Sequence, residues 1–361
     1  MRTKHTGPAA ADPQPYATPT QSPPPQVKSP QPAPELTAAD RAKLKDFLER
    51  TDKPFSITIA PQSRKRKRGA ESPSLREETE LFHERLSVQY EIKPFQNWES
   101  LKRYKKFTVG GESIAVGECI MVKNDMHENP RVDFAAQWKA KVLEVRALDA
   151  EHVYVRIAWM NRPEDLDEGR QPHHGKLELI ATNHMDIIDA MTVNGRLDLY
   201  AWDETDDEVQ MPGIQEHFWR QTLDVARTRE LSKLRLICQC QQPQNPDVSI
   251  LQCDSPKCRQ WMHVKCVVND AVQRAAQGST KKGRATKAKK SNPITLSPTL
   301  PAIAIAQKDA FTAELFVERW PDDTPSKETK ILITDGDGEK RTENVHCLLC
   351  QNAIEPTVPE D

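Results

Sequence analysis

Residues 238–266 read CQCQQPQNPDVSILQCDSPKCRQWMHVKC, and residues 347–350 read CLLC. These two stretches hold seven of the eight cysteines in the chain. Cysteines and histidines that arrive in closely spaced pairs are typical of zinc sites, because one pair supplies half of a tetrahedron from a single turn. Eight ligands in four pairs therefore predict two tetrahedral zinc sites. The pairs are Cys238 with Cys240, Cys253 with Cys258, His263 with Cys266, and Cys347 with Cys350.

The ligand order, four cysteines, one histidine and three cysteines, resembles a PHD finger, in which a tryptophan such as Trp261 also precedes the histidine by two residues. The resemblance implies an interleaved, cross-brace pairing. One zinc ion would be held by Cys238, Cys240, His263 and Cys266, and the other by Cys253, Cys258, Cys347 and Cys350. The gap between Cys266 and Cys347 is longer than PHD fingers usually have, but the entropy of loop closure grows only slowly with length.

Two other interpretations of the cysteines are weaker. RING-type ubiquitin ligases share the ligand order, but they usually have a tighter second pair and a longer step to the histidine. A disulfide framework suits secreted chains, whereas this chain starts without an apolar signal-peptide core and carries lysine-rich tracts. We therefore expect reduced thiols inside a cell. The remaining Cys119 lies in the apolar run Cys-Ile-Met-Val, which is typical of a buried side chain.

Residues 1–95 are predicted to form a disordered, Pro-rich and basic region, because this part of the chain is rich in proline and polar residues and poor in apolar ones. Thr37 and Asp40 form a capping box, which predicts a short helix over residues 37–50. No apolar run approaches the roughly 20 residues of a membrane span, so we expect no membrane partner. A nuclear import signal, and hence location in the nucleus, is predicted from the run Arg64, Lys65, Arg66, Lys67 and Arg68.

Residues 100–232 have the pattern of a small β-barrel-like domain, so the predicted fold class is mainly β. Alternation over residues 152–159 places Val153, Val155, Ile157 and Trp159 on one face of a strand. Further strands are predicted over residues 118–123, 138–145, 177–181 and 197–202, with turns between them. Residues 214–234 look more helical.

Three phrases in this range resemble BAH domains: WMNRPED at 159–165, GRQPHHGK at 169–176 and NHMDIIDA at 183–190. A BAH domain followed at once by a PHD finger is similar to a plant and fungal class of chromatin protein. The resemblance implies a BAH β-barrel-like domain at 100–232. It further implies a two-zinc cross-brace PHD finger at 234–352, with a long basic insertion at about 270–325.

Members of the BAH–PHD family read methylated lysines on the histone H3 tail, and their BAH domains recognise the Polycomb-type trimethyl mark in gene silencing. A trimethylammonium group has no N–H to donate, so aromatic faces hold it through cation–π attraction. By matching motifs, Trp138 and Trp159 correspond to two walls of the aromatic cage. The third expected ring falls on Asn161, and the nearest substitutes in sequence are Tyr154 and Trp202.

Other residues also match family positions. His174 and Asp186 correspond to positions that line the peptide groove, and Trp261 corresponds to a cage wall of methyl-lysine-reading PHD fingers. The partners of such a PHD cage are missing here, so a structural role for Trp261 is favoured. The acidic run at 203–208 has two interpretations: it steers a basic histone tail, or it is a solvated loop.

We expect no enzyme, because the chain has no Gly-rich phosphate loop, nucleophile elbow or metal-hydrolase helix motif. Protein ligands would fill both zinc sites, which leaves no open position for catalysis. The predicted function is a non-enzymatic chromatin reader that acts in transcriptional repression. Its expected partners are the H3 tail or nucleosome, other chromatin proteins, and DNA through basic tracts such as residues 281–290. The alternatives are a DNA-binding scaffold without methyl-lysine specificity, or a RING-like ubiquitin ligase.

Overall fold

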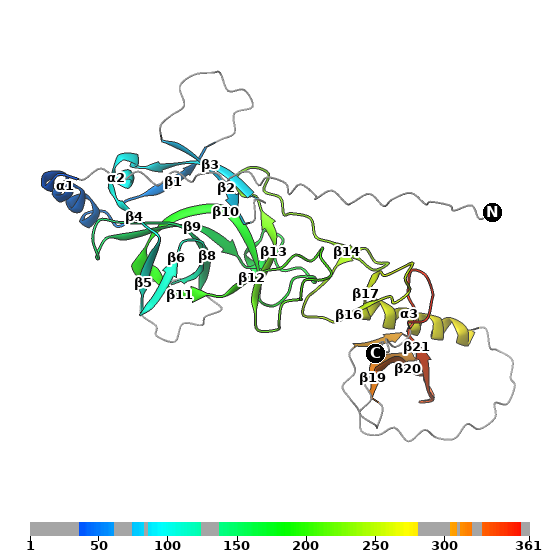
Figure 1. The fold of residues 1–361 in the computed structure, drawn as a ribbon. Helices are drawn as coiled ribbons and strands as arrows, with labels where there is room; N and C mark the ends of the chain where they lie inside the picture. The colour runs from blue at the N-terminus through cyan, green and yellow to red at the C-terminus, as the bar shows by residue number, and fades with distance from the viewer. Residues whose placement is uncertain are drawn as a thin grey trace, which may run out of the picture.

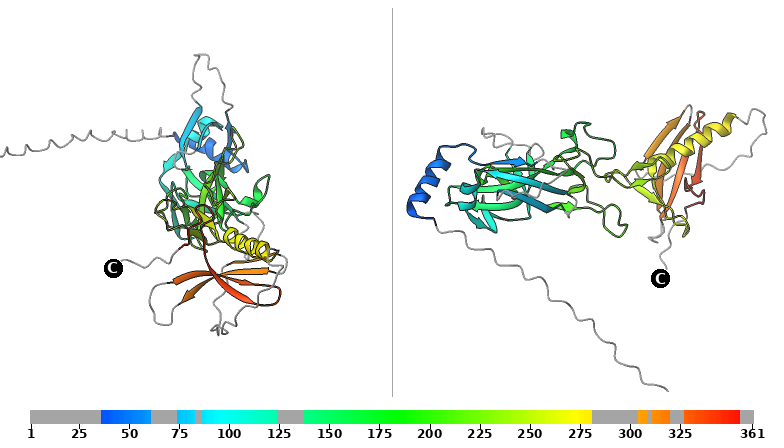
Figure 2. Two further views of the ribbon diagram at one scale, coloured as in Figure 1. Left: turned by 90° about the vertical axis from the view of Figure 1, so that its right-hand side faces the viewer. Right: turned by 90° about the horizontal axis from the view of Figure 1, so that it is seen from above.

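The computed structural model describes residues 36–60, 74–82, 86–123, 137–280, 304–308, 311–319 and 327–354. This described part is mainly β, as predicted. Two clusters of buried apolar side chains lie in its N-terminal part and one in its C-terminal part. The helices α1 and α3 lie at opposite ends of the molecule (Figures 1 and 2). Among the described helices, none combines the length and apolar character needed to cross a bilayer.

An eight-stranded sheet forms the centre of the N-terminal part, and it runs in the order β11, β7, β8, β9, β10, β13, β12, with β4 paired to β8. Its pairs are antiparallel, except that β13 runs parallel to both β10 and β12. The strands are β4 (Lys102–Tyr104), β7 (Cys119–Val122), β8 (Trp138–Ala147), β9 (Val153–Asn161), β10 (Glu178–Asp189), β11 (Val193–Leu197), β12 (Leu199–Ala201) and β13 (His217–Leu223). Short elements beside it are α2 (Phe95–Ser100), β5 (Lys106–Val109), β6 (Glu112–Ala115), η2 (Pro163–Asp165) and η3 (Ala190–Thr192).

The central strand β9 is buried on both of its faces. Val155 and Ile157 belong to one apolar cluster, in agreement with the alternation in the sequence. Tyr154 and Ala158 belong to the other cluster. Because each buried large apolar side chain stabilises the fold by about 1.5–3 kcal/mol, the strand is firmly held along its length.

The N-terminal residues correct the prediction of disorder over 1–95. The helix α1 (Ala38–Glu49) confirms the expected helix, and the Thr37 side chain caps it by accepting the N–H of Asp40 at 3.1 Å. Beyond it, however, lies a three-stranded antiparallel sheet in the order β1, β3, β2. Its strands are β1 (Ser56–Ile59), β2 (Leu75–Leu81) and β3 (Leu86–Lys93).

The physical reason for this difference is the alternation in β3. Val88, Tyr90 and Ile92 are at most 2% exposed, and together with Phe55 they cover the second face of the central sheet. The overall composition of residues 1–95 concealed this short period-2 pattern. Residues 1–35 and 61–73, including the predicted import signal at 64–68, lie outside the described residues.

A second correction concerns residues 214–234, which were expected to be helical. The structure instead has the strand β13, in which Phe218 and Trp219 are buried and which pairs with β10 and β12. The pairing partners lie far away in the sequence, so this tertiary context overrides the local pattern.

The C-terminal part consists of two small hairpins followed by a helix on a sheet. The hairpins are β14 (Leu236–Ile237) with β15 (Gln242–Pro243), and β16 (Ile250–Gln252) with β17 (Trp261–His263). The helix α3 (Val264–Thr280) packs on the antiparallel sheet β18 (Ala304–Lys308), β19 (Phe311–Arg319), β20 (Lys327–Thr334) and β21 (Lys340–Asn344). The described residues of the insertion between Cys266 and Cys347, which do not include the basic tract at 281–290, therefore form a folded unit that shares one apolar core with the finger.

Candidate functional site

Two groups of cysteine and histidine side chains converge in the C-terminal part. Within each group the ligand atoms all lie within 4.8 Å of one another. Their grouping is the cross-brace pairing that the PHD resemblance implied. The groups are Cys238, Cys240, His263 and Cys266, and Cys253, Cys258, Cys347 and Cys350.

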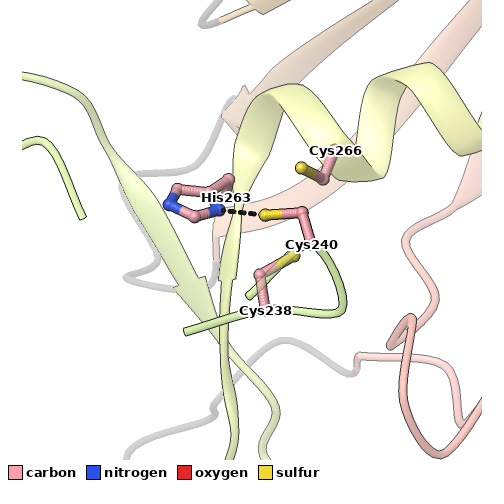
Figure 3. Close-up of side chains that lie close together, drawn as sticks. All are labelled: Cys238, Cys240, His263 and Cys266. Carbon is pink, nitrogen blue, oxygen red and sulfur yellow. Dashed lines mark hydrogen bonds between the residues drawn. The ribbon is translucent and has the colours of Figure 1, made fainter. Parts of the chain in front are cut away.

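The chemistry of these groups suits a metal ion. In the first group, Nδ1 of His263 lies 3.3 Å from Sγ of Cys240 (Figure 3). The other ring nitrogen, Nε2, lies 3.1 Å from the carbonyl oxygen of Pro243, which orients Nδ1 toward the cysteines. Burial raises the pKa of the Cys266 thiol to about 12, so this thiol would stay protonated at neutral pH unless a cation displaced its proton. Each group can therefore hold one metal ion.

The insertion brings the ligands of the second group together. Val345, which is fully buried in the shared core, immediately precedes the turn that carries Cys347 and Cys350. The N–H of Leu348 contacts Sδ of Met262 on β17 at 3.2 Å. The sheet of the insertion therefore positions the last two cysteines against the finger, so the long chain between Cys266 and Cys347 does not keep the second group apart.

The predicted cage residues Trp138 and Trp159 lie side by side at the ends of β8 and β9. Their ring centroids are 5.6 Å apart and their planes meet at 61°. Trp138 is 50% exposed, whereas Trp159 packs at the edge of an apolar cluster. The two suggested substitutes for a third wall lie elsewhere, because Tyr154 packs edge-on against Phe55 and Trp202 against Phe218.

A cavity of about 860 Å³ lies beside the end of β9, and both Asn161 and His174 line it. His174 is 4% exposed, and its Nδ1 accepts the N–H of Gln171 at 3.0 Å, so a neutral ring carries its proton on Nε2. Burial lowers the pKa of His174, and the charge of Arg220 lowers it further, which favours this neutral form. Four acidic residues, Asp165, Asp167, Glu168 and Glu230, line the same cavity, together with the basic residues Arg229 and Lys233.

Asp186 does not lie at this cavity, although it was expected at the same groove as His174. It is on β10, and its Oδ2 accepts a hydrogen bond from Nζ of Lys53 at 2.9 Å. Its other oxygen accepts the N–H of Ile187 at 2.8 Å. Asp186 thus joins the N-terminal segment to the central sheet.

Trp261 and the acidic run 203–208 meet at the junction of the two parts. The indole N–H of Trp261 donates to Oδ1 of Asp207 at 3.0 Å, and Arg235 donates to the same oxygen at 2.5 Å. Glu204 accepts from Nη1 of Arg220 and from the backbone N–H of Arg235, both at 2.6 Å. Both acidic residues therefore hold the finger against the sheet, and Trp261 takes a structural role.

The sequence patterns did not single out a second set of contacts at this junction. Asn245 donates through Nδ2 to the carbonyl of Pro172 at 2.8 Å, and Asp247 accepts the N–H of Lys176 at 2.5 Å. The Asn-Pro-Asp triplet at 245–247 is a turn signal that could have drawn attention to them. Nothing in the sequence indicates which distant carbonyls this turn would meet.

The fold and the two clusters agree with the class that the sequence resembles: a β-barrel-like BAH domain followed by a cross-braced PHD-type finger. The resemblance to BAH–PHD chromatin proteins is confirmed by two curated relatives from Arabidopsis thaliana. The chain is 26% identical over 170 residues to Chromatin remodeling protein EBS, which covers 46% of this chain and 68% of that protein. It is 25% identical over 170 residues to Chromatin remodeling protein SHL, with 47% and 71% covered.

No protein-family model matches the chain. Among solved structures, the yeast Rsc2 BAH domain is similar at a TM-score of 0.27 and 13% identity. That similarity covers 37% of this chain, and the chain spans 54% of the Rsc2 structure.

Proposed function

We propose that this chain is a nuclear, non-enzymatic chromatin reader whose BAH domain binds a histone H3 tail at a methylated lysine. The observation that carries the proposal is the pair of indoles Trp138 and Trp159, 5.6 Å apart, with half of Trp138 exposed. Both Arabidopsis relatives are chromatin remodeling proteins by name, which supports chromatin as the partner and the nucleus as the location.

Two indoles that meet at an angle can contact a trimethylammonium group on two sides. Each aromatic face contributes about 0.5–2 kcal/mol to holding such a cation, more when water is excluded. Asn161 stands where the third ring of the family would be, and it lines the neighbouring cavity. We therefore expect an open, two-walled site that binds the methylated lysine more weakly than a three-walled cage.

The cavity next to the indole pair suits the residues that flank the methylated lysine. Its four acidic residues, Asp165, Asp167, Glu168 and Glu230, outnumber the basic Arg229 and Lys233, so the lining favours a basic peptide such as a histone tail. The Arg162 side chain donates to Asp165 and lowers the pKa of that carboxyl group, so it stays ionised at neutral pH. Silencing through the Polycomb-type trimethyl mark is the specific role that the family resemblance favours.

Both metal ions are proposed to be zinc. Thiolate and imidazole donors in groups of four select zinc, and sites filled by four protein ligands are structural. Such ions would stabilise the finger and leave no open position for a reaction. The domain limits that we propose are 100–232 for the BAH domain and 234–352 for the finger, with α1 and the sheet β1–β3 as an N-terminal extension of the BAH core.

The test is calorimetric titration of the zinc-loaded full chain with three H3 peptides. One carries the Polycomb-type trimethyl mark, one the promoter-type trimethyl mark, and one is unmodified. We expect preference for the first peptide, with affinity at least fivefold lower in Trp138→Ala and Trp159→Ala. Tyr104→Ala is the matched control, because Tyr104 is 40% exposed on β4 and lies outside the indole pair.

Other results would redirect the function. Equal binding of all three peptides, unchanged by both tryptophan substitutions, would contradict methyl-lysine reading. If DNA then bound with a steep salt dependence, the scaffold alternative would be favoured. Autoubiquitination with a purified E2 enzyme would instead support the RING-like alternative.

A further inference from the structure

The loop of the finger between its first two ligand pairs touches the BAH loop that carries His174. Nδ2 of Asn245 donates to the carbonyl oxygens of Pro172 and His174, at 2.8 and 3.4 Å. Oδ2 of Asp247 accepts the backbone N–H of Lys176 at 2.5 Å. These bonds hold the backbone on both sides of His174, a residue that lines the cavity.

The side chain of Asn245 is itself oriented by a local turn. Its Oδ1 accepts the backbone N–H of Asp247 at 2.9 Å, and its carbonyl oxygen accepts the N–H of Val248 at 3.0 Å. This Asx turn commits the oxygen of the amide to the finger and leaves the NH₂ group to donate to the BAH loop.

The two loops are also in close contact at Gly175. A Cβ at this position would lie 3.0 Å from Cγ of Pro246 on the finger and 3.0 Å from Cζ of Phe218 on β13. Only glycine lets the BAH loop fit between these two neighbours without a shift. A movement of the finger loop would therefore also move the BAH loop.

The finger loop is in turn anchored at the first metal group. Pro243 lies two residues before Asn245, and its carbonyl oxygen lies 3.1 Å from Nε2 of the predicted ligand His263. The imidazole faces Cys240 with its other nitrogen (Figure 3). Pro243 also lines the cavity, as do residues 231–234 of the connection between the two modules.

We propose that Asn245 and Asp247 are positioning residues for the ligand site of the BAH domain, so that the finger and the BAH domain build this site together. The finger would then support BAH reading without touching the methylated lysine itself. This inference rests on the proposed function for its ligand, but the positioning of the His174 loop can be measured without a ligand.

The decisive variant is Asn245→Asp in the full chain. An aspartate keeps the oxygen that accepts the N–H of Asp247 but cannot donate to the two BAH carbonyls. Asn344→Asp, at an exposed position of β21, is the control with the same change of charge. Asp247→Ala removes the acceptor of the Lys176 N–H and provides a second, independent variant.

Three measurements are made on each variant: zinc content, affinity for the H3 peptide with the Polycomb-type trimethyl mark, and hydrogen exchange of residues 170–178. We expect two zinc ions per chain throughout. Asn245→Asp and Asp247→Ala should each bind the peptide about fivefold to tenfold more weakly, with faster exchange of the His174 loop, because each loses hydrogen bonds that hold it. Asn344→Asp should match the natural chain.

Unchanged affinity and unchanged exchange in both variants would overturn the inference. Weaker binding with unchanged exchange would also overturn it, because Asn245 would then contact the peptide directly. If the natural chain binds none of the three peptides, the proposed function fails, and hydrogen exchange alone then tests whether the finger positions the His174 loop. Faster exchange of residues 170–178 in Asn245→Asp and Asp247→Ala, but not in Asn344→Asp, would still support positioning by the finger.

Discussion

The substitution Arg220→Met should destabilise the BAH domain strongly, because it breaks a buried ion pair next to the cavity. The side chains of Arg220 and Glu178 are both 0% exposed, and Nε of Arg220 donates to Oε1 of Glu178 at 2.9 Å. Arg220 also donates to Glu204 at 2.6 Å and to the carbonyl of His173 at 2.8 Å. In the variant, the Glu178 carboxylate would keep the N–H of Gly175 at 2.8 Å as a donor.

Removal of one partner from a buried pair costs about 3–5 kcal/mol, because the other charge stays buried without compensation. For a domain of this size, each kcal/mol lowers the melting temperature by roughly 2–4 °C, so we expect a drop of about 6–20 °C. Adding Glu178→Gln to Arg220→Met should recover part of the loss, since the buried charge is then removed. The assay is urea and thermal unfolding, followed by circular dichroism.

The control for this experiment is Arg162→Met. Arg162 pairs with Asp165 at 2.8 Å, but the two side chains are 41% and 38% exposed. An exposed pair of this kind contributes about 0–1 kcal/mol, so the control should lose little stability. A loss below about 1 kcal/mol in Arg220→Met, or no recovery with Glu178→Gln, would refute the reasoning that an unpaired buried charge dominates.

Three more predictions concern the core of the finger, its contact with Asp207, and His173. Ile331 lies in the core that the insertion shares with the finger, so Ile331→Ala should lower the unfolding free energy by about 2–5 kcal/mol. This variant should also release one metal ion to a chromogenic chelator before the other. The control is Leu332→Ala, whose side chain lies on the other face of β20 and which should show neither effect. Asp207→Ala should speed hydrogen exchange around Trp261 and Arg235, while it lowers the unfolding free energy by no more than about 1 kcal/mol. Unchanged hydrogen exchange would show that this contact does not hold the two modules together. Burial lowers the pKa of His173 to about 4, together with repulsion from Arg220 and from His174 when that ring is protonated. An unfolded histidine takes up its proton near pH 6.5, so stability should be full above that pH and fall progressively toward pH 4. His173→Gln should flatten this dependence in unfolding titrations, and an identical pH profile would contradict the assignment.

Much of the finger could be predicted from the sequence, since ligand pairs are a local property. The two members of each pair lie at most five residues apart in the sequence, and the residue types are the ones that bind zinc. The structure groups the pairs as the PHD resemblance implied. The alternation over residues 152–159 likewise predicted a strand with Val155 and Ile157 on one face, because a strand that packs on a core shows its period in the sequence.

The N-terminal sheet and the strand β13 could not be predicted in the same way. The pairing of β1 with β3 and the parallel pairing of β13 with β10 join strands that have other strands between them in the chain. Composition described residues 1–95 as disordered because it averages over the few residues, such as Tyr90 and Ile92, that are buried. A short alternating run can be recognised as a buried strand only when the strands that pair with it are known.

The sequence alone determined which side chains carry the candidate chemistry: eight candidate metal ligands in four pairs, and two tryptophans that the BAH resemblance singled out. The four pairs follow from residue type and local spacing. Outside the two metal-ligand groups, only the tertiary structure decided which residues share a site. It placed His174 at the cavity and Asp186 against Lys53, and it paired Trp261 with Asp207. The reason is physical: a hydrogen bond or ion pair depends on distances of a few ångströms between segments, and the packing of the whole chain sets those distances.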